Sequence, residues 1–193
     1  MGDEKRVKDI MTHIDEYERL DQDARLCDAL AILRRKFEQT GGTAPGILHK
    51  TLIVTDSSKE IVGKLSIYDF IRGLVPEHAK KPEYSRSFYN MLASRAQSVA
   101  DEVSAMQESF QWLHTTFFDL VKKETQKRVR DVMSATHPLL KEEDTLNKAI
   151  YVMFKEDIRQ PMVVKEGKIV GMVSMMDLFP ELLEIAGDQC FFE

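Results

Sequence analysis

One stretch of ten residues occurs twice in this chain of 193 residues. IVGKLSIYDF at 61–70 returns as IVGMVSMMDL at 169–178, and the two copies share Ile, Val, Gly, Ser and Asp at matching positions. An internal repeat means that the fold is assembled from similar units, so it governs every later inference about secondary structure and sites. The extent of the repeat therefore decides how the chain is divided.

The repeat extends over most of the chain, in the same order in both copies. VKDIMT at 7–12 pairs with VRDVMS at 129–134, RLCDALAIL at 25–33 with TLNKAIYVM at 145–153, and TLIVTDSSKEIVG at 51–63 with PMVVKEGKIVG at 161–171. The offset falls from 122 to 108 residues, so the first copy is 14 residues longer, mostly through the glycine-rich stretch FEQTGGTAPGILHK. We predict one repeat in 1–74, a helical insert in 75–128, and a second repeat with a tail in 129–193.

Each repeat has a recognisable pattern of helices and strands. Apolar residues at helical spacing predict an amphipathic helix in both, at Leu26, Ala29, Leu30 and Leu33 and at Leu146, Ala149, Ile150 and Met153. Short β-prone runs predict strands at 52–55 and 60–67, and at 162–164 and 168–173, joined by the turn-like DSSK and KEG. A second helix follows each serine. We expect an α/β (α+β) fold of two β-α-β-β-α repeats that bury a shared face.

Composition narrows the class of protein. The apolar content of 43% is ordinary for a chain that buries a core, and the net charge of −5 with interspersed signs gives no sign of nucleic-acid binding. Two cysteines without a CxxC pair suit a reducing compartment. Since neither a leader peptide nor an apolar run near 18 residues is present, we expect a cytoplasmic protein without a membrane span.

Neither a catalytic motif nor a metal-binding motif is visible. The five histidines form no HxH or HxxxH pair, and the chain has no P-loop, GxSxG or GxGxxG. The methionine cluster Met172, Met175 and Met176 is typical of a flexible core or cleft lining. We therefore expect that the protein is not an enzyme and that it holds neither a metal nor a catalytic cofactor.

The recurring motifs resemble those of cystathionine-β-synthase (CBS) domains in tandem, the Bateman module. The resemblance rests on V-x-D-[IV]-M-[TS] at the start and I-V-G-x-[LV]-S-x-x-D at the end of both repeats. It implies a disc of two repeats around a pseudo-twofold axis, with two clefts that in many members bind adenosine nucleotides. By the same resemblance, Ser66 with Asp69 and Ser174 with Asp177 contact phosphate and ribose. It assigns Thr12 and Ser134 to the cleft lining.

The chemistry of these residues supports two interpretations. A serine that opens a helix presents backbone amides and a helix dipole to a phosphate, and an aspartate suits a ribose diol. The same S-x-x-D spacing is also close to a capping box, which stabilises a helix start without any ligand. The two roles can alternate at one site.

The two repeats differ at positions that bear on a ligand. Lys64 stands where the family usually has an apolar residue. Side chains alternate along a strand, so Lys64 lies on the same face as Ser66, and we hypothesise that it adds a cation for a phosphate. The alternative is a lysine that extends into solvent. In the second repeat, Pro180 predicts a kinked or later-starting helix. We therefore prefer the first repeat as the nucleotide site.

The span between the repeats carries a heptad-like apolar seam. Its members are Tyr89, Leu92, Ala96, Val99, Val103, Met106, Phe110, Leu113, Phe117 and Leu120. A helix over about 84–128 is predicted, either continuous, with exchange of repeats between chains, or folded back with Ser98 capping a second segment. Three roles are open for this seam: it packs on the chain's own repeats, it pairs helices across a homodimer, or it binds an effector protein. Trp112 and Phe118 lie off the seam.

The leading functional hypothesis is a regulatory module that senses an adenosyl ligand: AMP, ADP, ATP or S-adenosylmethionine. A structural or interaction protein that works through the helical insert, with empty clefts, is the alternative. A homodimer is the expected assembly, and neither nucleic acid nor membrane is an expected partner.

Overall fold

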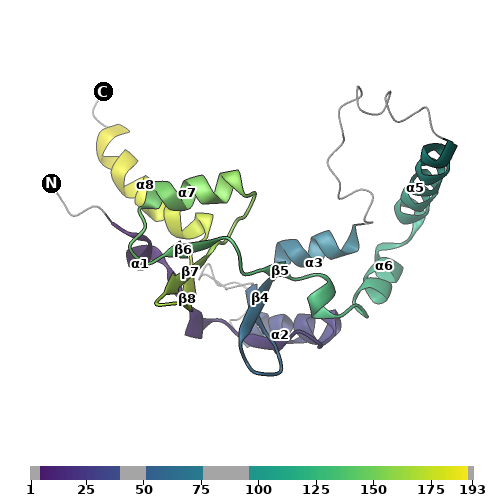
Figure 1. Ribbon diagram of the computed structural model, residues 1–193, viewed down its shortest axis with the longest axis horizontal. Coiled ribbons are helices and arrows are strands. Elements are labelled where there is room, and N and C mark those ends of the chain that lie inside the picture. The colour runs from purple at the N-terminus through teal and green to yellow at the C-terminus, as the bar shows by residue number, and fades with distance from the viewer. Residues whose placement is uncertain (1–4, 40–50, 76–95, 191–193) are drawn as a thin grey trace. The chain divides into compact units, whose positions relative to one another are not determined.

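The computed structural model of the chain describes residues 5–39, 51–75 and 96–190 (Figure 1). Helices and strands alternate within them, which confirms the predicted α+β class. The chain divides into two compact units. Unit 1 comprises Met1–Asp21, Pro45–Lys64 and Ser134–Glu193, and unit 2 comprises Gln22–Ala44 and Leu65–Met133.

Unit 1 contains the strands and unit 2 is helical, except that the last two residues of β4 fall in unit 2. The elements of unit 1 are α1 (Val7–Ile10), β1 (Thr12–His13), η1 (Ile14–Glu16), β2 (Arg19–Asp21), β3 (Thr51–Thr55), β4 (Ile61–Ser66), β5 (Ser134–Ala135), β6 (Leu139–Lys141), α7 (Leu146–Lys155), β7 (Met162–Lys165), β8 (Lys168–Met172) and α8 (Met175–Cys190). Those of unit 2 are α2 (Leu26–Gln39), α3 (Ile67–Leu74), α5 (Ala96–His114), α6 (Phe117–Glu124) and η3 (Val129–Asp131).

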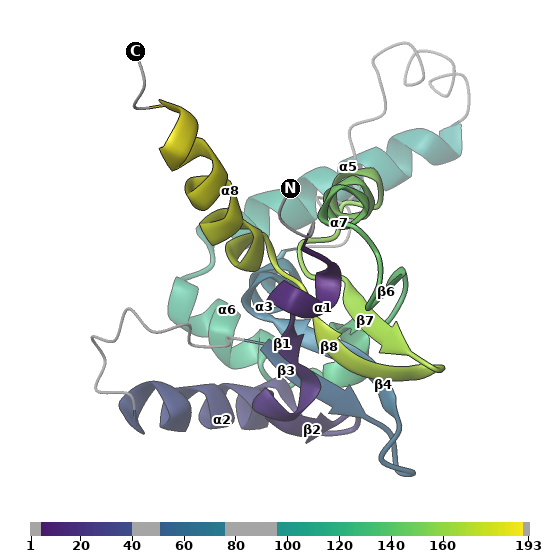
Figure 2. The same ribbon diagram turned by 90° about the vertical axis from the view of Figure 1, so that its left-hand side faces the viewer.

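The strands form two four-stranded sheets, in the orders β1-β8-β7-β6 and β2-β3-β4-β5. In the first, β7 and β8 make an antiparallel hairpin and β6 runs parallel to β7, as Figure 2 shows. The predicted strand pairs are confirmed, but each sheet also has an edge strand from the other repeat. Thr12 of β1 pairs with Met172 of β8, and Ser134 of β5 pairs with Lys64 of β4. The opening motif of each repeat thus lies beside the closing motif of the other.

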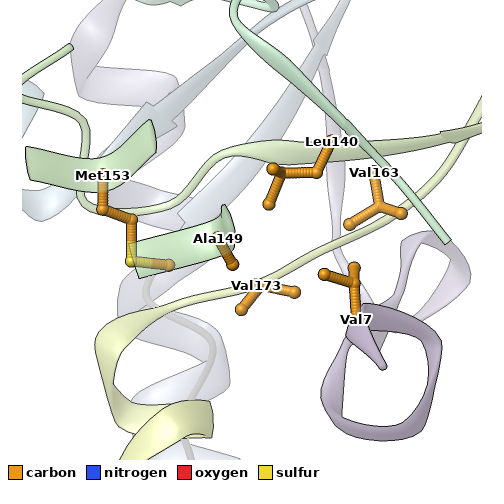
Figure 3. Close-up of a cluster of buried hydrophobic side chains, with 6 residues drawn as sticks. All are labelled: Val7, Leu140, Ala149, Met153, Val163 and Val173. Carbon is orange, nitrogen blue, oxygen red and sulfur yellow. The ribbon is translucent and has the colours of Figure 1, made fainter. Parts of the chain in front are cut away.

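The first sheet buries one face under α7. Figure 3 shows the cluster, in which α1, β6, α7, β7 and the residue after β8 each contribute. Its members are Val7, Leu140, Ala149, Met153, Val163 and Val173, all at most 2% exposed. Burial of each larger side chain stabilises the fold by roughly 1.5–3 kcal/mol. The predicted helix faces are only partly correct, because Leu30 and Ile150, which match in the repeat, are 37% and 41% exposed.

A second cluster joins the two sheets within unit 1. It consists of Ile14, Tyr17, Ile53, Met162 and Met172. Ile53 comes from β3 in one sheet, whereas Met162 and Met172 come from β7 and β8 in the other. The two sheets therefore share a hydrophobic core, as expected for repeats that cannot bury their faces alone.

The aspartate of V-x-D-[IV]-M has a structural role in both repeats. Asp9 Oδ2 accepts the Arg6 amide at 2.6 Å, and Asp131 Oδ2 accepts the Arg128 amide at 3.3 Å. Each carboxylate reaches back three residues and pairs with an amide that the short helix leaves without a partner. The opening motif therefore encodes a turn of helix with its own cap.

The stretch between the repeats contains two described helices, α5 and α6, and residues 76–95 lie outside the described residues. Ser98 lies inside α5, so the predicted break there is wrong. The helices separate at Thr116, whose hydroxyl accepts the Asp119 amide at 3.1 Å and donates to Asp119 Oδ2 at 2.6 Å. The capping pattern S/T-x-x-D occurs at Ser98, with Asp101, and again at Thr116, with Asp119. The chain breaks at the second, where the preceding Thr115 hydroxyl donates to the Gln111 carbonyl at 2.7 Å.

None of the helices in the described ranges is long and apolar enough to cross a lipid bilayer.

Candidate functional site

The N-terminus of α3 is closed by Ser66 and Asp69, as the capping interpretation predicts. Asp69 Oδ2 accepts the Ser66 amide at 2.7 Å and the Ser66 hydroxyl at 2.6 Å, and the Asp69 amide donates to Ser66 Oγ at 3.3 Å. Asp69 is buried, with only 1% of its surface exposed. A reciprocal box of this kind satisfies the first amides of the helix.

Ser174 and Asp177 repeat this arrangement at the start of α8. Asp177 Oδ2 accepts the Ser174 amide at 2.6 Å and the Ser174 hydroxyl at 2.8 Å, and the Asp177 amide donates to Ser174 Oγ at 3.3 Å. The predicted later start of this helix is wrong, because α8 begins at Met175 directly after the cap. Pro180 lies inside α8, beyond the turn that the cap fixes. It therefore gives no reason to prefer the first repeat.

Strand β1 brings Thr12 to the second closing motif. Thr12 pairs with Met172, two residues before Ser174, and His13 pairs with Gly171. A Cβ atom at Gly171 would lie 2.6 Å from the Thr12 carbonyl oxygen and 2.9 Å from the Met11 sulfur. The glycine of the second I-V-G is therefore required for the close approach of the two strands.

Tyr17 is a further residue of this site that sequence reasoning missed. It is 6% exposed, it hydrogen-bonds the Thr12 side chain, and it lies within electrostatic reach of Asp177. The pKa of Tyr17 is raised to about 12, mainly by burial and to a smaller extent by the Asp177 charge, while the hydrogen bond with Thr12 acts in the lowering direction. Tyr17 is thus a neutral hydrogen-bonding group at physiological pH. Its spacing of five residues from Thr12 matches no motif.

Lys64 is buried in unit 1, at 4% exposure, so the alternative of a lysine extended into solvent is wrong. Its ammonium donates to the Gln160 backbone carbonyl, and the Gln160 side-chain oxygen accepts the Thr51 hydroxyl at 2.9 Å. Ser134 is the strand partner of Lys64. A buried ammonium requires polar partners, and here a carbonyl supplies one.

The structure thus gathers Thr12, Ser174 and Asp177 in unit 1, together with Tyr17. Lys64 and Ser134 are paired in unit 1, and the cap formed by Ser66 and Asp69 belongs to unit 2. Both bonds from Ser174 go to Asp177 Oδ2, so Oδ1 is the carboxylate oxygen that the cap itself leaves for a ligand hydroxyl.

A cavity of about 500 Å³ lies elsewhere, within unit 2. It is lined by the end of α3, by α5 and by α6, and it includes none of the sequence-predicted site residues. Trp112 Nε1 donates to the Leu74 carbonyl at 2.8 Å at its edge, and the buried Glu124 carboxylate is ion-paired with Lys127. Across the described residues, no group of three or more His, Cys, Asp or Glu side chains is placed to hold a metal ion.

Comparison with known proteins identifies the fold. Residues 129–184 match the family model of the CBS domain. The CBS-pair protein CBSX2 from Arabidopsis thaliana has a TM-score of 0.56 and 20% identity, over 95% of this chain and 97% of that one. A CBS domain-containing protein of unknown function from Bacillus anthracis has a TM-score of 0.53 and 16% identity, over 93% and 94%. No curated protein sequence matches the chain.

A structure of CBSX2 in complex with AMP is also similar, with a TM-score of 0.52 and 19% identity over 94% of this chain and 98% of that chain. The second repeat therefore matches the CBS domain, and the chain as a whole has the fold of the solved CBS-pair proteins.

Proposed function

We propose that this protein is a non-catalytic regulatory module that binds an adenosine nucleotide or a related adenosyl ligand at Thr12, Ser174 and Asp177. The observation that carries the proposal is the pairing of Thr12 with Met172, which brings the opening motif of one repeat to the closing motif of the other. The AMP-bound CBSX2 relative supports an adenosine ligand for this fold.

The chemistry of the site suits a nucleotide. The first amides of α8 and its dipole attract a phosphate, and Asp177 Oδ1 is able to accept a ribose hydroxyl. The Asp177 charge opposes a phosphate placed beside it, so the ribose and the phosphate must occupy different sides of the cap. Tyr17, neutral and fixed by Thr12, adds a hydrogen-bonding group and an aromatic wall.

The remaining candidates keep their predicted roles as parts of the proposal. Ser66 and Asp69 present the same groups at the start of α3, and Lys64 with Ser134 forms the strand pair before them. The ligand regulates only if it binds two arrangements of the protein with different affinity. AMP, ADP, ATP and S-adenosylmethionine are the ligands to compare.

Calorimetric titration of each ligand tests the proposal, with Asp177→Asn and Asp69→Asn as matched variants. Asparagine keeps one oxygen for the serine amide but replaces the second carboxylate oxygen with a donor. Asp177→Asn is expected to weaken binding at least tenfold, and Tyr17→Phe to weaken it less. Equal affinity of Asp177→Asn and the natural protein would remove this site from the proposal, and Asp69→Asn would then show whether the other cap binds.

A second candidate function is an interaction module that binds no nucleotide. The observation that favours it is the exposure of large apolar side chains on α5 and α6, among them Met106 at 76% and Phe118 at 73%. A thermal-shift series with all four ligands separates the two candidates, because an interaction module gives no shift with any of them.

A further inference from the structure

The cavity of unit 2 is a candidate binding site that is separate from the nucleotide site. It is lined by the end of α3, by α5 and by α6, which are labelled in Figure 1. Its volume of about 500 Å³ lies within the range of roughly 300–1,000 Å³ that small-molecule sites occupy. The described lining residues all belong to unit 2, so they form the cavity without a contribution from unit 1.

The two helices between the repeats each turn one polar face toward this cavity. On α5 the lining residues are Glu108, Gln111, Trp112 and Thr115. On α6 and the turn after it they are Leu120, Lys123, Glu124 and Lys127. In both sets the spacing is i, i+3, i+4 and i+7, which places four side chains on one side of a helix. The sequence therefore directs two helix faces into one space.

The most buried residue of the lining is the acid Glu124. It is 8% exposed, and its Oε2 is ion-paired with the Lys127 ammonium. Across the described residues, this buried oxygen accepts no hydrogen bond. A buried carboxylate normally accepts several hydrogen bonds, so the ion pair alone leaves Glu124 short of donors. Because Lys127 takes Oε2, Oε1 is the oxygen that the pair leaves for a donor inside the cavity.

The end of α3 adds partial negative charge at the same place. Lys127 Nζ donates to the Gly73 carbonyl at 3.3 Å, and Trp112 Nε1 donates to the Leu74 carbonyl at 2.8 Å. Both carbonyls belong to the last turn of α3, where the helix dipole favours a cation. The Trp112 N–H is occupied by this bond, so the indole offers its ring to a ligand. These groups and the Glu124 carboxylate together suit a ligand ammonium.

The charges of the lining decide between classes of ligand. Glu108 and Lys123 are exposed, whereas Glu124 is buried, so a second carboxylate and a free-standing ammonium lie nearer to solvent. With Lys127, the lining carries two carboxylates and two ammonium groups, and its formal charge is zero. A polyanion meets two carboxylates, and a polycation meets two ammonium groups. A ligand with one positive and one negative group therefore matches the lining better than either.

The other walls of the cavity are apolar. They consist of Leu74, Val75 and Leu120, with the Trp112 ring beside them. Apolar walls with a few polar groups are typical of small-molecule sites, in which the polar groups fix the orientation of the ligand. These walls suit an aliphatic or aromatic side chain on the zwitterion.

We propose that this cavity binds a free α-amino acid with an apolar side chain of the size of leucine, methionine or phenylalanine. The ligand ammonium lies against Glu124 Oε1, the carboxylate reaches Lys123, and the side chain packs against Trp112. The site is independent of the proposed nucleotide function, because it shares no residue with it.

Intrinsic fluorescence tests the proposal, because Trp112 is the only tryptophan of the chain. Each of the three L-amino acids is titrated to about 10 mM, and at least one is expected to change the fluorescence with a Kd on the order of 0.1 mM. Calorimetry should give the same Kd. Isoamylamine is leucine without its carboxylate, and isocaproate is leucine without its amine. Each is expected to bind about tenfold more weakly than leucine, because each loses one charged contact.

Variants assign the two charged contacts. Lys123→Gln is expected to weaken leucine binding about tenfold but to leave isoamylamine binding unchanged, because isoamylamine has no carboxylate. Lys122→Gln is the matched control: Lys122 is the neighbouring exposed lysine of α6 and is not among the described lining residues, so leucine binding should not change. Glu124→Gln is expected to weaken leucine and isoamylamine binding but not isocaproate binding. Circular dichroism verifies that each variant is folded.

Three outcomes would overturn the proposal. If none of the three amino acids changes the fluorescence or releases heat, the cavity binds no ligand of this class. If isoamylamine or isocaproate binds as tightly as leucine, the site does not recognise a zwitterion. If Lys122→Gln weakens binding as much as Lys123→Gln, the carboxylate contact lies elsewhere. A protein that binds AMP but no amino acid would refute this proposal alone and leave the nucleotide function standing.

Discussion

The Ser66 hydroxyl donates to Asp69 Oδ2 at 2.6 Å, and the pair closes the N-terminus of α3. The same contact is 2.8 Å between Ser174 and Asp177 at α8, and 2.6 Å between Thr116 and Asp119 at α6. Only the first two belong to the closing motif that recurs in both repeats. The S/T-x-x-D pattern thus caps the start of three different helices in this chain. The pattern alone does not make a ligand site, which requires further groups around it.

Burial should determine how much each of these caps contributes to stability. Asp69→Ala is expected to lower the free energy of unfolding by about 2 kcal/mol, because Asp69 is 1% exposed and its loss leaves Ser66 without its acceptor. Asp119→Ala, at an exposed cap, is expected to cost about 0.5 kcal/mol. Urea titration followed by circular dichroism measures both. An Asp119→Ala variant as unstable as Asp69→Ala would show that burial does not set the cost.

Gly171 should tolerate no side chain. Gly171→Ala places a Cβ 2.6 Å from the Thr12 carbonyl oxygen, so β1 must move away from β8. We expect a loss of more than about 2 kcal/mol in unfolding free energy, within the range of severe overpacking. Gly167→Asn is the control, because its φ of +79° suits asparagine and nothing lies within 4 Å of the new Cβ. Equal melting temperatures of the two variants would contradict the close approach.

The sequence predicted most helices and strands well, because their formation depends on the spacing of apolar residues and on turn residues close by in the chain. Short β-prone runs bounded by turn-like residues located β3, β4, β7 and β8, and apolar residues at helical spacing located α2 and α7. The exchange of edge strands was not predicted, because the pairing of Thr12 with Met172 joins residues far apart in the sequence, and two-residue strands have no periodicity to detect.

The candidate site was predicted less completely. The S-x-x-D spacing identified both caps, since capping geometry is local. Tyr17 was missed because only the folded sheets bury it beside Thr12 and Asp177. The predicted later start of α8 was wrong because the effect of Pro180 was judged without the cap, which fixes the first turn upstream of the proline.

Asp144 should make stability depend on pH in the acid range. Burial raises the pKa of Asp144, but the Lys141 amide and the Lys148 ammonium, both at 2.8 Å, outweigh it, so the pKa is lowered from 3.8. A lowered pKa in the folded state gives stability that is complete above about pH 5 and is lost as the pH falls through the folded value.

Asp144→Asn is therefore expected to lower the unfolding free energy by about 1 kcal/mol at pH 7, and the difference should shrink below about pH 3. Lys148→Gln removes one of the two donors and should give a smaller effect with the same pH trend. Urea titrations between pH 2.5 and 7 measure both. A difference between Asp144→Asn and the natural protein that is constant over this range would show that Asp144 does not titrate differently on folding.

Substitution of Lys64 tests the predicted phosphate contact. Because Lys64 is buried, its ammonium has a defined position. Its ammonium now donates to the Gln160 carbonyl, and a phosphate oxygen would be a stronger partner because it carries charge. Lys64→Met introduces the residue of the matching position, Met172, which is 1% exposed and well packed in its own sheet. In an Asp177→Asn background, which reports on the first-repeat candidates alone, nucleotide affinity measured by calorimetry is expected to fall about tenfold, whereas Lys168→Met, at an exposed lysine of β8, should leave it unchanged. If Lys64→Met binds as the natural protein does, Lys64 is a structural residue and not a phosphate contact.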